Sequence, residues 1–333
     1  MAPTLSIPLF LVSLVVALAS AAVFARTLDR LGVRIGLPEA LLGLLTALAA
    51  DGPEIASAIV ALVKGANGVS LGVVVGSNVF NLAAMLGLTA VVAGGIRLRR
   101  ETLVIEGTVG VLVTLIAAGV VLDRVPAGVA VVLIGCVLLP YLLLLARGPQ
   151  IAGRLPFSEK VNRGLARALG EREHWGYHEK VEDETAWRLV ALMVAAAAMI
   201  VLGSTGMVEA AISLGGHWDV PSRLLGFLVL APLTSLPNAA TALRLGRADR
   251  GAALVSETLN SNTINLVAGI TIPALLVTVV SLRTKTAFEL AWLLATTVVS
   301  LFMLWRPGGL RRRDGALLIG LYLVFCIVEI AQA

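Results

Sequence analysis

Long apolar runs recur along the whole length of this 333-residue sequence. A helix needs about 20 mostly apolar residues to cross a bilayer, and in hydrocarbon only helices or closed barrels satisfy every backbone polar group. We expect about ten such helices, at approximately 5–25, 38–63, 69–94, 103–122, 127–146, 188–208, 222–243, 251–280, 286–305 and 315–332. With 58% hydrophobic and 14% charged residues, the chain is predicted to be an all-α polytopic membrane protein and not a soluble domain.

Basic residues are concentrated in alternate loops between these runs. One set of loops contains the segment 147–188 together with Arg26, Arg30, Arg34, Arg97, Arg99, Arg100, Arg244, Arg247, Arg250, Arg306, Arg311, Arg312 and Arg313. Because cytoplasmic loops are enriched in Lys and Arg, this distribution predicts a multi-pass protein of the cell membrane with both termini outside. The basic flank also favours a retained first helix over a cleaved signal peptide. The net charge of +5 then arises from the basic residues of the cytoplasmic loops. Anionic lipid headgroups, and not nucleic acid, are therefore the expected binding partners of these residues.

The sequence contains an internal repeat. When it is shifted by 184 positions, the segment 43–84 aligns with 227–268. The alignment pairs Pro53 with Pro237 and superimposes two copies of the pattern S-N-x-x-N. In a sequence this apolar, a shared proline and a shared polar pattern are more informative than matches between Leu and Ala.

The loop charges give the two copies opposite orientations in the membrane. The second run passes from inside to outside, and its counterpart, the seventh, passes from outside to inside. Inverted repeats of this kind build many secondary transporters, which bind their substrate near the midplane between the halves. We predict a first five-helix repeat over 1–146, a cytoplasmic linker over 147–187 and a second five-helix repeat over 188–333.

Prolines interrupt the second and the seventh run. Pro53 and Pro237 lack an N–H and clash with the preceding turn, so each is expected to kink its helix. The kinks should free carbonyl oxygens near Ala49 and Leu233. In hydrocarbon, a freed carbonyl needs a partner from the protein, from water or from an ion.

Oxygen-bearing side chains gather in the same runs. Glu257, Ser261 and Asn265 are four residues apart, which places them on one face of a helix. Hard cations such as Ca²⁺ take about six to eight oxygen ligands from carboxylates, carbonyls and amides. The candidate metal ligands are Asp51, Glu54, Ser77, Asn81, Thr234, Ser235, Asn238, Glu257, Ser261 and Asn265.

A structural role is the alternative for the uncharged members of this set, because Ser, Thr and Asn join helices in membranes. The carboxylates Asp51, Glu54 and Glu257 favour a site, since each costs roughly 2.5–3.5 kcal/mol to insert. No Lys or Arg is available at that depth, so a cation, a proton or a water-filled cavity is the expected compensation. Glu289 and Glu329 lie near the ends of runs, where we expect water to solvate them.

Two pairs of motifs resemble a known family. GLLTALAADGPE (43–54) with GSNVFN (76–81), and LVLAPLTSLPN (228–238) with NSNTIN (260–265), are similar to the two α-repeats of the sodium/calcium exchanger family, in the cation/Ca²⁺ antiporter superfamily. This resemblance implies a ten-helix antiporter with four broken helices, the second, third, seventh and eighth, around shared sites for Ca²⁺ and Na⁺. It also implies that the first and sixth helices slide across this central bundle.

The resemblance assigns roles to particular positions of this sequence. It implies that Glu54 is the principal carboxylate of the first repeat and that Asn81 and Asn265 line the central site. It further implies that Ser77 and Ser261 flank the sites, and that the backbone before each proline supplies carbonyl oxygens.

The sequence departs from the family pattern at its charged positions. Ala50 and Asp51 stand where the family has Thr and Ser, Asn238 replaces a glutamate, and Glu257 stands where Asn is usual. We infer that negative charge has been relocated around the cavity. Because selectivity depends on the number and geometry of ligands, the identity of the ion stays open. Closely spaced carboxylates also favour a bound proton, which makes H⁺ an alternative to Na⁺.

The expected function is secondary-active antiport of Ca²⁺ against Na⁺ or H⁺ by alternating access, with inorganic cations as substrates. We expect a monomer without a cofactor and without enzymatic activity. No G-x-x-x-x-G-K-[ST] motif occurs, so an ion gradient should drive transport. The main alternative is an antiporter for K⁺, Mg²⁺ or Mn²⁺. A non-transporting scaffold is less favoured, and so is an intramembrane hydrolase using Asp51 and Glu54 as acid and base, because an inverted repeat has no use in that chemistry.

Overall fold

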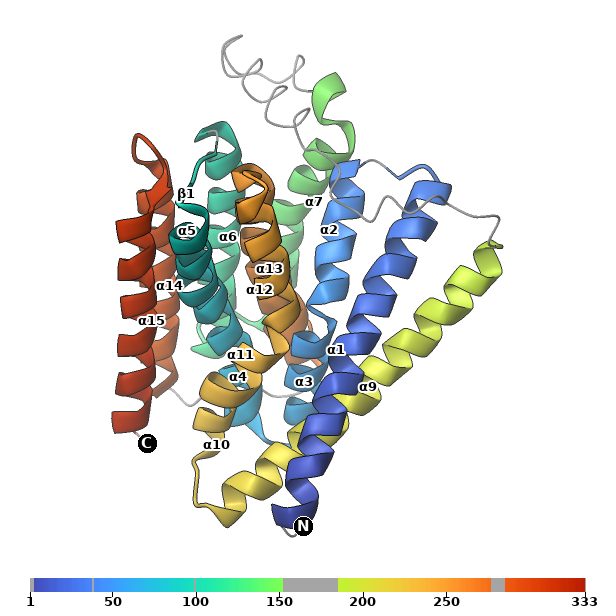
Figure 1. The fold of residues 1–333 in the computed structure, drawn as a ribbon, viewed down its shortest axis with the longest axis vertical. Helices are drawn as coiled ribbons and strands as arrows, with labels where there is room; N and C mark the ends of the chain where they lie inside the picture. Colours follow the sequence, from blue (N-terminus) through green and yellow to red (C-terminus); the bar gives the residue numbers. More distant parts are fainter. Residues whose placement is uncertain (1–2, 38, 99, 152–184, 277–284, 333) are drawn as a thin grey trace.

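The computed structural model describes residues 3–37, 39–98, 100–151, 185–276 and 285–332, and these are almost entirely helical (Figure 1). The first half consists of α1 (Pro3–Arg34), α2 (Glu39–Ala50), α3 (Gly52–Val63), α4 (Asn67–Val79), η1 (Phe80–Met85), α5 (Leu86–Ala93), β1 (Gly95–Ile96), α6 (Arg100–Val121) and α7 (Ala127–Ile151). The second half consists of α9 (Ala186–His217), α10 (Ser222–Leu224), η3 (Leu225–Leu230), α11 (Ala231–Thr234), α12 (Leu236–Arg247), α13 (Gly251–Leu266), η4 (Val267–Thr271), η5 (Pro273–Leu275), α14 (Lys285–Trp305), β2 (Leu310–Arg311) and α15 (Arg312–Ala331). Most of the predicted linker, 152–184, lies outside the described residues.

The helices account for the predicted spans. Within the described ranges, seven helices are long and apolar enough to cross a membrane, and two bent pairs raise the total to nine. The remaining predicted span, 251–280, contains α13 followed by the π-helical η4. Most side chains of α13 are buried by other helices, so this span tolerates polar residues that a lipid-facing helix would not. The all-α polytopic prediction is confirmed.

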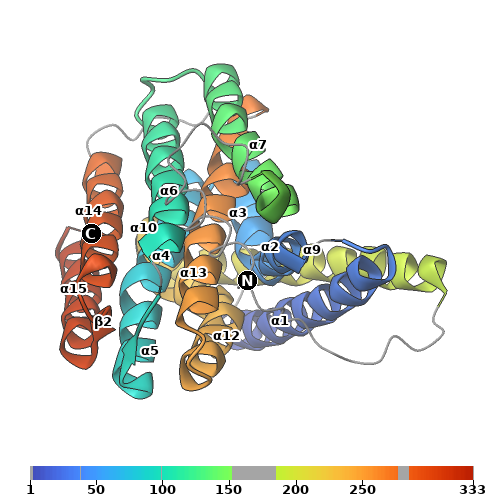
Figure 2. The ribbon, with the colours of Figure 1, turned by 90° about the horizontal axis from the view of Figure 1, so that it is seen from above.

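The first and sixth spans are longer than predicted. α1 and α9 each contain 32 residues, whereas the apolar runs suggested approximately 5–25 and 188–208. At 1.5 Å per residue such a helix is about 48 Å long, well beyond a hydrocarbon core of about 30 Å. The two helices pack against each other to one side of the remaining bundle (Figures 1 and 2). Their length therefore requires a strong tilt or ends that project beyond the hydrocarbon.

Both predicted proline kinks are present. The chain bends by 53° between the segments Leu44–Ala50 and Gly52–Val63, and by 47° between Ser222–Thr234 and Leu236–Arg247. Pro53 and Pro237 occupy the first turns of α3 and α12, where a missing N–H costs nothing because those N–H groups have no partner within the helix. Each broken span therefore places a new helix N-terminus inside the protein.

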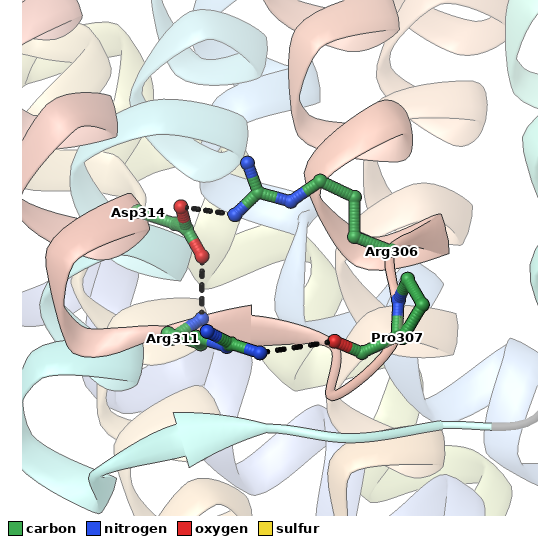
Figure 3. A network of polar contacts seen from close by, with 4 residues as sticks. All are labelled: Arg306, Pro307, Arg311 and Asp314. Atoms are coloured by element: carbon green, nitrogen blue, oxygen red, sulfur yellow. Dashed lines mark hydrogen bonds and ion pairs between the residues drawn. The ribbon is translucent and has the colours of Figure 1, made fainter.

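Both termini lie at the same end of the bundle, and the loops after α1, α5, α12 and α14 lie at the other end (Figure 1). At that opposite end β1 pairs with β2 in an antiparallel arrangement, which ties the α5–α6 connection to the α14–α15 turn. Asp314 holds this turn: it accepts hydrogen bonds from Arg306 Nη2 at 2.5 Å and from the Arg311 backbone N–H at 2.9 Å (Figure 3). The Arg311 guanidinium donates in turn to the Pro307 carbonyl at 3.3 Å.

Glu289 and Glu329 do not lie in water, and the expectation of solvated span ends is wrong for both. Their residues are 1% and 3% exposed. Arg223 forms an ion pair with Glu289 and approaches Glu329 Oε2 to 3.8 Å. The interaction joins the start of the seventh span to α14 and α15. Apolar runs alone could not show it, because the partner Arg223 comes from a distant part of the sequence.

Candidate cation-binding site

The N-termini of α3 and α12 meet at the centre of the bundle. Polar side chains of the first repeat contact polar side chains of the second repeat there. Ser235 Oγ donates a hydrogen bond to Glu54 Oε1 at 2.6 Å, and Asn238 Nδ2 donates to Asp51 Oδ1 at 2.7 Å. Under the shift of 184 positions, Asp51 corresponds to Ser235 and Glu54 to Asn238. The two bonds are therefore equivalent contacts, made crosswise between inverted halves. Helix N-termini also stabilise the negative charge of the carboxylates.

Side chains of α13 complete the contacts of these carboxylates. Ser261 Oγ donates to Asp51 Oδ1 at 2.7 Å, and Asn265 Nδ2 donates to Glu54 Oε2. Asn238 Nδ2 also approaches Glu54 Oε1 at 3.4 Å. The predicted spacing of four places Ser261 and Asn265 on the same face of α13, as expected.

The third and eighth spans are joined by a second symmetric contact. Asn78 Nδ2 donates to the Asn262 carbonyl at 3.2 Å, and Asn262 Nδ2 donates to the Asn78 carbonyl at 3.2 Å. Asn81 Nδ2 lies 3.3 Å from Ser261 Oγ and 3.3 Å from Asn262 Oδ1. Both spans change to π-helical turns nearby, at Phe80–Met85 and Val267–Thr271, and π-turns inside helices are frequent at functional sites.

The group contains more oxygen acceptors than donors. Asp51, Glu54, Asn81, Asn238 and Asn265 are each at most 1% exposed. Among the described residues, no hydrogen-bond donor reaches Asp51 Oδ2 or the Oδ1 atoms of Asn81, Asn238 and Asn265. Buried oxygens without donors are costly, and a hard cation is the ligand that satisfies several of them at once.

Two predicted hydroxyl ligands bond mainly to their own helices. Ser77 Oγ donates to the Val73 carbonyl at 2.7 Å, and Thr234 Oγ1 donates to the Leu230 carbonyl at 2.9 Å. Both residues are fully buried, and the Ser77 hydroxyl also interacts with Glu54. They line the group without bridging the two repeats.

Glu257 lies apart from the hydrogen-bonded group. It is 3% exposed, and no donor within the described residues reaches its Oε2 atom. Its carboxylate interacts electrostatically with those of Asp51 and Glu54. In the part of the chain that the structure describes, no three His, Cys, Asp or Glu side chains come close enough to hold a metal by themselves. An ion bound here would therefore depend on the amide and hydroxyl oxygens as well as on the two central carboxylates.

The sequence interpretation missed a second polar chain on α13. Ser256 Oγ donates to Glu106 Oε1 at 2.6 Å, Asn260 Nδ2 donates to Ser256 Oγ at 3.3 Å, and Tyr141 OH donates to Asn260 Oδ1 at 2.8 Å. Glu106 is 1% exposed and lies inside the fourth apolar run. Its position in the sequence was the available signal, because ionisable residues are rare within membrane spans. The reciprocal bonds of Asn78 and Asn262 fit the packing role that Asn often has between membrane helices.

Inverted halves, two helices broken at prolines and a buried, acceptor-rich group between them define the class: this is a membrane cation antiporter. The comparison with known families agrees. The family model described as sodium/calcium exchanger protein matches residues 5–147 and 188–331. The chain belongs to this family, and the resemblance seen in the motifs is confirmed. The two matched segments leave out 148–187, which overlaps most of the predicted linker.

Individual relatives are distant but similar over their full length. The sodium/calcium exchanger MaX1 of Methanosarcina acetivorans is 23% identical, over 98% of each chain. The putative antiporter CaxA of Alkalimonas amylolytica is 24% identical, over 91% of this chain and 90% of its own. Among solved structures, an H⁺/Ca²⁺ exchanger CAX has a TM-score of 0.74 at 16% identity, over 97% of this chain and 82% of its own. The sodium-calcium exchanger NCX_Mj has a TM-score of 0.59 at 18% identity, over 97% and 98%. These structures share the fold.

Proposed function

We propose that this protein exchanges Ca²⁺ for Na⁺ or H⁺ and binds the ions at the central group around Asp51 and Glu54. The observation that carries the proposal is the set of buried oxygens without donors, contributed by Asp51, Asn81, Asn238 and Asn265. The two central carboxylates supply two negative charges, which match one divalent cation or two monovalent ones. Ser235 and Ser261 add hydroxyl oxygens that already contact the carboxylates.

Ser77 and Thr234 support the group from its edges in this proposal, and Glu257 adds negative charge beside it. The α1–α9 pair is the element proposed to move. Its packing is close: a Cβ on Gly203 would lie 2.8 Å from the Ser13 carbonyl oxygen. Such contacts between small residues let helix backbones approach within a membrane. We further propose that the protein acts as a monomer, with both termini outside, as its basic loops indicate.

The test is a panel of exchange assays with the purified full-length protein in proteoliposomes. Uptake of radioactive calcium is driven by an outward Na⁺ gradient, by a pH gradient or by neither, with the membrane potential clamped. The proposal predicts uptake in at least one gradient and loss of at least about 100-fold in Glu54→Gln. The matched control is Glu101→Gln, because Glu101 is exposed in the first turn of α6 and should transport normally.

Two results would contradict the proposal. One is equal transport by Glu54→Gln and Glu101→Gln, which would remove Glu54 from the ion pathway. The other is the absence of calcium uptake in every gradient. Uptake of K⁺, Mg²⁺ or Mn²⁺ in the same panel would then assign a different cation to the same architecture.

A further inference from the structure

A partly open cavity of about 240 Å³ lies beside the central group. Its wall includes Ala25 of α1, Thr46 and Ala50 of α2, and Pro237 and Thr241 of α12. Ala50 and Pro237 immediately precede Asp51 and Asn238 in the sequence. The cavity therefore adjoins the two broken-helix N-termini that hold the proposed ligands.

Glu257 also lines this cavity. Its Oε2 atom has no hydrogen-bond donor among the described residues, and neither does Thr46 Oγ1 on the same wall. Most of the other lining residues are alanines, which offer no competing polar group. A carboxylate that is 3% exposed, lies next to a cavity and has no cationic partner shown among the described residues needs a compensating charge within that cavity.

The cavity has the size of a hydrated cation. Liquid water occupies about 30 Å³ per molecule, so 240 Å³ admits about eight waters. A hard cation carries a shell of about six to eight oxygens. An ion in this cavity can thus keep its water shell, whereas an ion at Asp51 and Glu54 must exchange that shell for amide and hydroxyl oxygens.

The cavity lies toward the basic end of the bundle. Its wall includes Arg244, which lies with Arg247 in the last turn of α12. The positive-inside rule places this basic end of the bundle in the cytoplasm. Arg244 is exposed, so water and salt screen its charge, while the buried Glu257 is screened much less. Among the described residues that line the cavity, Glu257 is the one acidic side chain, and it interacts electrostatically with the carboxylates of Asp51 and Glu54.

We propose that Glu257 is a docking subsite that holds the transported cation with its water shell on the cytoplasmic side, before the ion loses water and reaches Asp51 and Glu54. The subsite rests on the proposed function and assigns Glu257 a separate step. A central ligand serves ions arriving from either side. A docking group serves only ions arriving through its own cavity.

The test measures the KM for calcium from each face separately. Exchange is followed with radioactive calcium in membrane vesicles of known orientation, right-side-out and inside-out, for the wild type, Glu257→Gln and Glu101→Gln. A divalent ion held about 6 Å from a carboxylate across water is attracted strongly enough to change affinity about tenfold. Glu257→Gln should raise the KM from the cytoplasmic face about tenfold and leave the KM from the outer face within about twofold.

A second variant reports on the cavity without altering Glu257. Ala240 lines the same wall and is exposed, so Ala240→Cys can be labelled in a background where Cys136→Ser and Cys326→Ser remove the two native thiols. A cationic thiol reagent applied from the cytoplasmic face should raise the KM on that face. An anionic reagent of similar size should lower it or leave it unchanged, which separates charge from steric block.

The outcomes distinguish this inference from the proposed function. A Glu257→Gln variant that loses exchange from both faces, as Glu54→Gln is expected to, would make Glu257 a central ligand and overturn the docking subsite while leaving the antiporter proposal intact. Unchanged KM values on both faces would also overturn it. A wild type that moves no cation would instead refute the proposed function itself.

Discussion

Replacing Asn238 by aspartate should turn a close hydrogen bond between the two repeats into a repulsion. In the wild type, Asn238 Nδ2 donates to Asp51 Oδ1 at 2.7 Å and approaches Glu54 Oε1 at 3.4 Å. Asn238→Asp has nearly the same shape but removes the donor and adds a third carboxylate. Two unit charges about 3 Å apart repel by about 5 kcal/mol at an effective dielectric constant of about 20.

The cost should appear as lost thermal stability that a cation restores. At roughly 2 °C per kcal/mol for a protein of this size, Asn238→Asp should melt roughly 10 °C below the wild type in chelator. Calcium bound between the carboxylates removes the repulsion, so saturating calcium should recover most of the difference and stabilise the variant more than the wild type. The melting curves can be followed by intrinsic fluorescence, since the chain contains 5 Trp.

A double substitution isolates the pair. Asp51→Asn combined with Asn238→Asp exchanges the two groups, so one amide again faces one carboxylate and the number of charges is unchanged. The double variant should melt close to the wild type, while Asp51→Asn alone loses the carboxylate that accepts from Asn238 and from Ser261. The double-mutant cycle reports the interaction energy of the pair directly.

Two results would refute this reasoning. One is an Asn238→Asp protein that melts like the wild type in chelator, which would show that the two side chains do not face each other. The other is a double variant as unstable as Asn238→Asp alone, which would show that the charge pair between positions 51 and 238 does not cause the loss.

Further predictions concern packing. A Cβ on Gly226 would lie 2.6 Å from the Val69 carbonyl oxygen, so Gly226→Ala should force α4 and η3 apart and lower the free energy of unfolding by about 1–3 kcal/mol. Gly128→Ala is the control, because a Cβ there meets nothing within 4 Å. Equal melting temperatures of the two variants would contradict the prediction. Tyr141→Phe removes the donor to Asn260 Oδ1 and should cost about 1–3 kcal/mol; an unchanged melting curve would show that this bond contributes nothing.

The sequence predicts the fold well where the bilayer imposes it. Apolar runs locate the spans because hydrocarbon requires helices of a set length, and Pro53 and Pro237 locate the breaks because proline removes a backbone donor. Helix lengths are predicted poorly for α1 and α9, since both continue well beyond their apolar runs. A helix that is tilted or projects from the membrane need not be apolar to its ends, so hydropathy underestimates its length.

The candidate site is predictable in its membership but not in its connections. The repeat and the spacing bring Asp51, Glu54, Asn238 and Ser261 into one group, which the structure connects by hydrogen bonds. The same spacing gives no sign that Glu257 faces a cavity instead. Which side of a buried helix meets a cavity depends on the packing of every neighbouring helix, and a single sequence does not contain that information in its local pattern.

The two repeats have the same arrangement of broken helices but different charged residues. Among the described residues, five hydrogen bonds to the Asp51 and Glu54 carboxylates come from the second half, from Ser235, Asn238, Ser261 and Asn265. From the first half, the Ser77 hydroxyl interacts with Glu54. At these two carboxylates the first half therefore supplies the acceptors, and the second half supplies most of the donors.

At the proposed ion site, this distribution of donors and acceptors would link ion binding to contact between the halves. A cation at the carboxylates competes with the donors of the second half for the same lone pairs. Each amide can then turn about its terminal bond and offer its oxygen to the ion instead of its N–H to the carboxylate. Without an ion, hydrogen bonds hold the two halves together; with an ion, coordination by oxygens from both halves does. A partly coordinated ion leaves both the carboxylates and the amides without their full set of partners. Such an intermediate is high in energy because its buried groups lack partners, and that cost would prevent ions from leaking through without exchange.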